Sequence, residues 1–269
     1  MNRNLFLKEL GRNTLSFVIW TIVIILFISV TMAVYPVFLE NQSKVIGMMS
    51  IVPGELLQFK GISNFNDLLS PLGFYAVNNI IYMMVLGSIY SIVLSSGILL
   101  KEEYNKTAEY LLTRPLTRSE IFVSKLAVFA LNVFLLNLVT TLAGFICLQL
   151  VKDGPFSFSA FLILSLYTLL LNFLFGALGL FLSTLIRRAK PITTLSIGLV
   201  LIFYFIFTLS KITEGIEKIG YLSPFKFVNT NATDPAYAIN SWHLVYFIGI
   251  SIVLTVLSHR LYKRKDIYL

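Results

Sequence analysis

One polar stretch decides how this sequence folds, and it reads KEEYNKTAEYLLTRPLTRSEIFVSK over residues 101–125. Nine of these 25 residues are charged, whereas the long apolar runs on both sides carry no charged side chain. Pro115 ends the first helical part, because proline lacks an amide hydrogen and clashes with the preceding turn. Thr117 and Glu120 have the spacing of a capping box, which predicts that a new helix starts directly after Thr117. The sequence therefore predicts two apolar helices that are joined by a short, charged, helical segment over residues 101–120.

The composition of the chain is that of a membrane protein. Of its 269 residues 57% are apolar and only 13% are charged, which leaves too little polar surface for a soluble domain of this size. The apolar residues form blocks that reach the roughly 20 residues a helix needs to cross a bilayer. The net charge of +8 comes from Lys and Arg between these blocks. This distribution disfavours nucleic acid as a partner.

The apolar blocks predict an all-α integral membrane protein with a single domain over residues 1–269 and six membrane-spanning helices. Residues 1–13 combine basic and apolar side chains, which is typical of an interfacial helix that enters a membrane. The predicted spans cover about 15–39, 73–100, 121–151, 156–186, 192–210 and 242–262.

The Lys and Arg residues predict the orientation of the spans. Fifteen of the 21 fall in the amino-terminal segment, in residues 101–125, in the turn at 187–190 and in the carboxyl-terminal tail, and six fall in the other connections. Short loops rich in Lys and Arg stay in the cytoplasm. We therefore expect both termini and the segment 101–120 on the cytoplasmic side.

Several motifs are missing from the sequence, and each absence disfavours a class of protein. There is no GxxxxGK[ST] sequence, so the chain is not expected to be an ATP-hydrolysing enzyme or to bind a cofactor itself. There is no HExxH motif and no Cys/His cluster with metal-ligand spacing, so no metal site is predicted. The apolar cores of the spans hold no ionisable residue, which disfavours an ion-coupled carrier. A membrane-embedded enzyme stays open as an alternative, although we find no catalytic constellation at the membrane boundary.

Polar side chains inside the predicted spans allow two interpretations. Asn132, Asn137 and Asn172 each need a hydrogen-bond partner, because an unpaired amide in hydrocarbon is costly. Small residues recur at a spacing of four in the second and fourth spans, which lets helices approach closely. The asparagines either join helices or line a substrate path at a subunit interface.

The charged segment resembles the signature of a known family. The residues that carry this resemblance are Glu103, Thr107, Glu109, Tyr110, Leu111, Leu112, Pro115, Arg118, Ile121 and Lys125. They are similar to the first cytoplasmic loop of ABC-2 type permeases, the six-span membrane subunits of ATP-binding-cassette (ABC) exporters. Lys106 stands where the family commonly has glycine, and Thr117 stands where it commonly has serine. The first departure affects the start of the short helix, and the second is conservative.

The resemblance implies a partner and a mechanism. The segment between the second and third spans would be a cytoplasmic coupling helix, and the first eight of these residues, from Glu103 to Arg118, would dock it into a groove on a separate ABC ATPase subunit. ATP and Mg would bind to that partner. The working unit would hold two ATPase copies and a second permease, either an identical copy or a paralogue, in the lipid bilayer of a bacterial plasma membrane.

These expectations together predict the membrane-spanning permease subunit of an ABC exporter. Spans rich in Phe and Tyr and free of buried charge suit an amphipathic or apolar cargo, and a peptide is favoured because the chain resembles the peptide-toxin exporter branch. Two alternatives stay open. The segment 101–120 could be a solvated loop, and the chain could be a membrane assembly or sensor subunit that transports nothing.

Overall fold

The structure is a computed structural model that describes residues 2–49, 68–104, 116–151, 156–186, 192–212, 215–234 and 237–264. In these ranges the chain forms helices and connecting segments and no strand. The elements in chain order are the α-helices α1 (Arg3–Glu40), α2 (Gln42–Met49), α5 (Pro71–Tyr104), α7 (Arg118–Val151), α8 (Phe158–Leu185) and α9 (Ile192–Ile212), the 3₁₀ helices η1 (Glu217–Leu222) and η2 (Pro224–Phe227), and the α-helix α10 (Ser241–Arg264).

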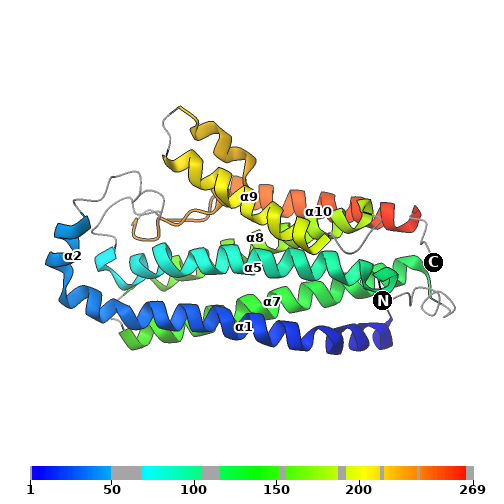
Figure 1. Ribbon diagram of the computed structural model, residues 1–269, viewed down its shortest axis with the longest axis horizontal. Coiled ribbons are helices and arrows are strands. Elements are labelled where there is room, and N and C mark those ends of the chain that lie inside the picture. The colour runs from blue at the N-terminus through cyan, green and yellow to red at the C-terminus, as the bar shows by residue number, and fades with distance from the viewer. Residues whose placement is uncertain are drawn as a thin grey trace.

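Six of these helices are long and apolar enough to cross a membrane: α1, α5, α7, α8, α9 and α10. The prediction of an all-α protein with six membrane-spanning helices is confirmed. In Figure 1 the long helices run side by side along the longest axis of the molecule, except that α9 diverges from the others toward η1.

Polar side chains at the amino-terminal ends set where several helices begin. Thr117 Oγ1 accepts a hydrogen bond of 3.2 Å from the Glu120 amide, and Glu120 Oε2 accepts one of 2.9 Å from the Thr117 amide. The predicted capping box is therefore confirmed, and it starts α7. Ser157 is the N-cap residue of α8, and its Oγ accepts a hydrogen bond of 3.3 Å from the Ala160 amide.

The first residues of α1 and the last residues of α10 lie at one end of the bundle, which we call the basic end (Figure 1). Exposed basic side chains gather there from both helices: Arg3, Lys8, Arg12, Arg260, Lys263 and Arg264.

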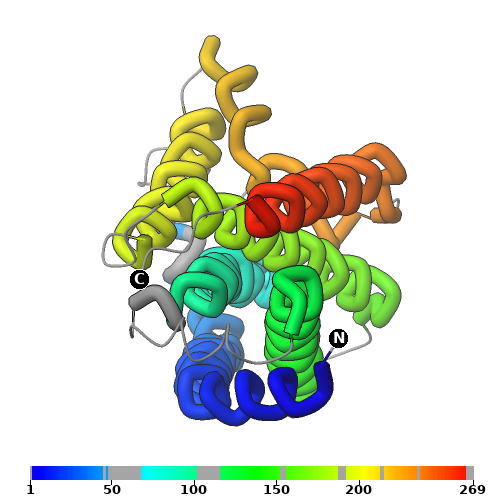
Figure 2. Tube along the Cα trace, turned by 90° about the vertical axis from the view of Figure 1, so that its right-hand side faces the viewer, coloured from blue at the N-terminus to red at the C-terminus, as the bar shows by residue number. Residues whose placement is uncertain are grey.

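The amino-terminal part of α1 changes direction relative to the rest of that helix. Figure 2 shows these turns lying across the basic end, whereas the later part of α1 runs along the bundle. We call these crosswise turns the transverse part of α1.

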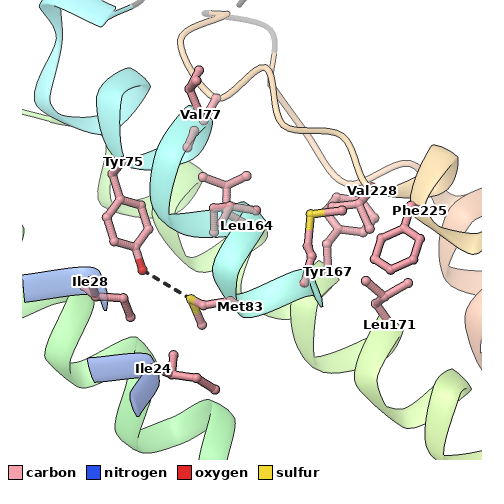
Figure 3. Packing of buried hydrophobic residues seen from close by; sticks show 14 of the residues in the cluster. Ile24, Ile28, Tyr75, Val77, Met83, Leu164, Tyr167, Leu171, Phe225 and Val228 are labelled. Atoms are coloured by element: carbon pink, nitrogen blue, oxygen red, sulfur yellow. Dashed lines mark hydrogen bonds between the residues drawn. The ribbon is translucent and has the colours of Figure 1, made fainter. Parts of the chain in front are cut away.

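α5 and α8 form the centre of the bundle, and both run toward the basic end. Small residues bring the two helices together, as their spacing in the sequence predicts. A Cβ atom on Gly179 would lie 2.5 Å from the Ile92 carbonyl oxygen, and one on Gly87 would lie 2.5 Å from Asn172 Nδ2. Figure 3 shows how apolar side chains fill the space between α5 and its neighbours. Ile24 and Ile28 reach this core from α1, and Phe225 reaches it from η2.

Candidate functional site

The first two turns of α7, residues 118–125, hold the ends of three other helices at the basic end. We call these residues the α7 hub. They overlap the end of the charged segment 101–120 that the sequence identifies as the candidate coupling element. Hydrogen bonds join the α7 hub to α1, α5 and α10.

The contact between the α7 hub and α10 combines two polar links and two aromatic contacts. The Arg118 guanidinium donates a hydrogen bond of 3.2 Å to the Lys263 carbonyl oxygen. Ser119 Oγ lies 2.9 Å from His259 Nε2. The Phe122 ring packs against His259 and Tyr262, with centroids 5.0 and 5.8 Å away. The last turns of α10 are thus attached to α7 by Arg118, Ser119 and Phe122 of the hub.

The transverse part of α1 is attached to the same two turns of α7. The Asn2 amide donates a hydrogen bond of 2.9 Å to Ser124 Oγ. Leu5 is buried in an apolar cluster that also contains Ile121 and Phe122 of the α7 hub and Ile98 of α5. The start of α1 is therefore held against the α7 hub by a hydrogen bond and by apolar packing.

Lys125 links the α7 hub to α5. Its side chain is fully buried, and its Nζ donates a hydrogen bond of 2.6 Å to the Ile98 carbonyl oxygen. A lysine is rarely buried unless its charge is compensated. A carbonyl in the last turns of α5 gives such compensation, because the carboxyl-terminal end of a helix carries partial negative charge.

A buried acidic residue on the transverse part of α1 lies at the same end of the bundle. Glu9 is 1% exposed, and its Oε1 lies 3.2 Å from Arg12 Nη1. Asn13 Nδ2 donates to the Glu9 carbonyl oxygen at 2.8 Å. Leu5, Glu9 and Asn13 follow one another at a spacing of four, so they form the face by which this part of α1 packs on the bundle.

Most of the predicted coupling residues lie outside the described part of the chain. Arg118 is described, and its side chain joins α10 as reported above. Glu103 falls in the last turn of α5, but its side chain is outside the description. The predicted residues that lie wholly outside the described ranges are Thr107, Glu109, Tyr110, Leu111, Leu112 and Pro115. The coupling helix and its docking role stay predictions.

A crevice of about 400 Å³ opens between α1, α5 and α9 near the basic end. Figures 1 and 2 both show α5 lying between α1 and α9 on this side of the bundle. The walls mix polar, apolar and aromatic side chains. The lining residues are Asn13, Ser16, Trp20, Tyr90, Val93, Leu94, Gly97, Ile98, Leu100, Lys101, Ile192 and Thr193.

The three predicted substrate-path asparagines lie in the interior of the bundle. Asn137 Oδ1 accepts a hydrogen bond of 3.2 Å from Asn172 Nδ2, and Asn172 Oδ1 accepts one of 3.3 Å from Ser88 Oγ. This chain of bonds joins α7, α8 and α5. Asn132 Oδ1 accepts from the Tyr90 hydroxyl at 3.4 Å, so it lies one side chain behind the wall of the crevice. All three amides join helices, and a role in a substrate path stays a prediction.

Glu9 is a site residue that the sequence reasoning did not single out, and for Lys125 the sequence reasoning gave the family resemblance but not the burial. Glu9 follows the buried Leu5 by one helical turn, and Lys125 lies four residues after the buried Ile121. A charged residue on the apolar face of a helix is therefore the signal that could have identified both.

As for metals, the described residues contain no group of three or more His, Cys, Asp or Glu side chains that could hold an ion.

Comparison with known proteins assigns the chain to a family. A family profile described as "ABC-2 family transporter protein" matches residues 3–267, which is nearly the whole chain. No curated protein matches the sequence. Six apolar helices fit the membrane subunit of such a transporter. The chain belongs to the ABC-2 family of transporter proteins.

Proposed function

We propose that this chain is the permease subunit of an ABC exporter that moves an amphipathic or apolar cargo, with a peptide as the favoured class, out of a bacterial cell. Family membership makes the chain a membrane transport component and implies an ABC ATPase as its partner. In our proposal the basic end faces the cytoplasm. Two ATPase copies and a second permease, identical or paralogous, complete the working unit.

The α7 hub is the observation that carries this proposal. The charged segment lies between α5 and α7, and the hub joins the start of α7 to α1, α5 and α10. A force that an ATPase applies to the segment would therefore reach four helices, because the first two turns of α7 are joined to α1, α5 and α10. Close-packed interfaces transmit such displacements because they do not deform continuously.

The cargo class is supported by the crevice and by the spans. A crevice with both polar and aromatic walls suits a molecule that has a polar part and an apolar part. Its position between α1, α5 and α9 near the basic end would place it where cargo enters from the cytoplasm or from the inner leaflet.

Co-purification and ATP hydrolysis test the proposal together. The permease is expressed with a candidate ABC ATPase subunit from the same genome, purified by a tag on the permease, and placed in lipid nanodiscs. We expect the ATPase to remain bound and its rate of hydrolysis to rise when amphipathic peptides are added. An ATPase that does not co-purify, or a hydrolysis rate that no member of a cargo panel changes, would favour the assembly or sensor alternative.

A further inference from the structure

The last turn of α9 carries a lysine, Lys211, at the end of the bundle opposite to the basic end. Ile192, the first residue of α9, lines the crevice near the basic end, and the helix has 21 residues. At a rise of about 1.5 Å per residue α9 is about 30 Å long, which matches the hydrocarbon core of a bilayer. We therefore expect Lys211 at the level of the lipid head groups, which a lysine reaches while its stem stays in apolar surroundings.

η2 carries a second lysine, Lys226, and is attached to α9. In Figure 1 the chain turns back after α9, so that η1 lies beside this helix and η2 follows. Ser223, which precedes η2, donates a hydrogen bond of 2.7 Å from its Oγ to the Phe203 carbonyl oxygen. Phe225 is fully buried, and its ring centroid lies 6.3 Å from that of Phe207. Lys226 therefore leaves a closely packed segment.

Lys226 lies close to Lys211. A Cβ atom on Gly220 of η1 would collide with Ser210, and it would lie 3.4 Å from Cδ of Lys226. The stem of Lys226 therefore passes beside the residue that precedes Lys211 in α9. The two ammonium groups are near enough to repel each other. We call these two residues the lysine pair.

The lysine pair keeps its positive charge within the described part of the chain. Lys226 is the one charged group among the described residues that acts on Lys211, and no described carboxylate forms an ion pair with either lysine. Nζ of Lys211 lies 4.5 Å from the Phe207 ring centroid, and Nζ of Lys226 lies 5.7 Å from that of Tyr221. A ring face attracts a cation but does not neutralise it. Both lysines are partly exposed, so an anion can reach them and relieve their repulsion.

We propose that the lysine pair binds the phosphate of an anionic phospholipid. Its position at head-group level favours a lipid over a soluble anion, because the phosphates of a bilayer lie at that level. Tyr221 and Leu222 of η1 are exposed and offer apolar surface to the glycerol and to the first carbons of the chains. With the basic end in the cytoplasm, as proposed above, the lipid belongs to the outer leaflet. The binding needs neither ATPase nor cargo, so this inference goes beyond the proposed export function.

Acetylation of single lysines measures binding at this site. A phosphate that binds an ammonium group stabilises its protonated form, which does not react with an acetylating ester. The purified permease, in a nonionic detergent and without ATPase, is acetylated, and the acetylated fraction of each lysine is followed by peptide mass spectrometry. The additions are dioleoyl phosphatidylglycerol, dioleoyl phosphatidylcholine or water-soluble glycerol 3-phosphate. Lys218, an exposed lysine of η1, is the internal control.

We expect phosphatidylglycerol to slow the acetylation of Lys211 and Lys226 by at least about fivefold and to leave Lys218 unchanged. Phosphatidylcholine, whose head has no net charge, should give the same protection only at a roughly tenfold higher concentration. Lys211→Gln should weaken the protection of Lys226 by phosphatidylglycerol roughly tenfold, because one of two cations is lost. The matched control Lys218→Gln should leave the protection of Lys226 as it is in the natural chain.

Three results would overturn the proposal. Equal protection of Lys218 and the lysine pair, or equal protection by both phospholipids, would reflect general coverage by lipid. Protection by glycerol 3-phosphate at the concentration that suffices for phosphatidylglycerol would assign the pair to a soluble phosphate. Protection that is seen only in a Glu214→Gln variant would mean that this glutamate, which lies outside the described residues, neutralises the pair.

The outcome is independent of the export function. A failure of lipid protection leaves the proposed export function intact, since no ATPase takes part in the measurement. Conversely, loss of ATPase co-purification would leave the lipid-binding result standing.

Discussion

Lys125 of α7 and Ile98 of α5 form a buried link between the two helices that flank the charged segment. The fully buried lysine donates through Nζ to the Ile98 carbonyl oxygen at 2.6 Å. The link lies about two turns from the end of α5 and about two turns from the start of α7. It therefore joins α5 and α7 close to the two points at which the segment leaves these helices.

Reversing the charge of Lys125 tests the strength of this link. Lys125→Glu would place a carboxylate against a carbonyl oxygen in the interior, and an uncompensated buried charge costs about 3–5 kcal/mol. We expect the variant to lose most of its folded, detergent-extractable protein. Lys8→Glu is the matched control, because the same change at an exposed position should have little effect. Equal yields and equal melting temperatures for the two variants would show that Lys125 is not buried as described.

A pair of glycine substitutions tests how closely α5 and α8 approach. In Gly179→Ala the new methyl group would collide with Ile92 and Ser95, and overpacking of this kind costs about 1–3 kcal/mol. In Gly198→Ala the methyl group meets open space on α9, so the better helix propensity of alanine should stabilise the protein by up to about 1 kcal/mol. Thermal unfolding of the purified permease should move in opposite directions for the two variants.

Asn172→Leu separates the two interpretations of the buried asparagines. The substitution removes the hydrogen bonds to Asn137 and Ser88. Buried Asn137 Oδ1 and Ser88 Oγ then each have one hydrogen-bond partner fewer, which lowers the free energy of unfolding by about 1–3 kcal/mol. We expect a lower melting temperature for the permease alone, without ATPase or cargo. If the melting temperature is unchanged and export is lost, the amide serves the substrate path instead of joining helices.

Accessibility to a membrane-impermeant maleimide tests the orientation. In a Cys147→Ser background, cysteine is introduced at Asn231, which is exposed between η2 and α10, or at Asn4, which is exposed on the transverse part of α1. With the basic end in the cytoplasm, Asn231→Cys should react in intact cells, and Asn4→Cys should react only after lysis. The reverse pattern would place the basic end outside.

The sequence predicted the features of this fold that depend on local pattern. The Thr117–Glu120 capping box forms because its two side chains are close in sequence and need no tertiary partner. The six apolar helices were predictable because the length of an apolar block is itself the physical requirement for crossing a membrane. The small residues of α5 and α8 also indicated a close helix contact, which Gly179 and Ile92 make.

The candidate site depended on tertiary contacts that no local pattern contains. Glu9 and Lys125 belong to basic, polar stretches of the sequence, and only the packing of α1 and α7 shows that both are buried. The crevice brings together Trp20, Tyr90 and Thr193 from three helices that are far apart in the chain. Their meeting depends on the direction of each helix, and the periodicity of a single helix does not specify it.

The central claim is that the segment between α5 and α7 receives force from an ATPase and passes it to the α7 hub. The sequence predicts that Tyr110, Leu111 and Leu112 form the apolar ridge by which this segment docks. Burying such a ridge stabilises a complex by several kcal/mol, at about 25 cal/mol per Å² of apolar surface. Reversal of a charge at the rim, as in Glu109→Lys, should matter less, because exposed ion pairs contribute about 0–1 kcal/mol.

The most direct measurement is ATPase pull-down and cargo-stimulated ATP hydrolysis in a Leu111→Ala, Leu112→Ala double variant. The account predicts that the variant permease folds and inserts normally, as judged by its melting temperature, while ATPase binding or cargo stimulation of hydrolysis is lost. Glu109→Lys, measured beside it, should retain most of both. Wild-type levels of ATPase binding and of stimulated hydrolysis in the double alanine variant would contradict the account.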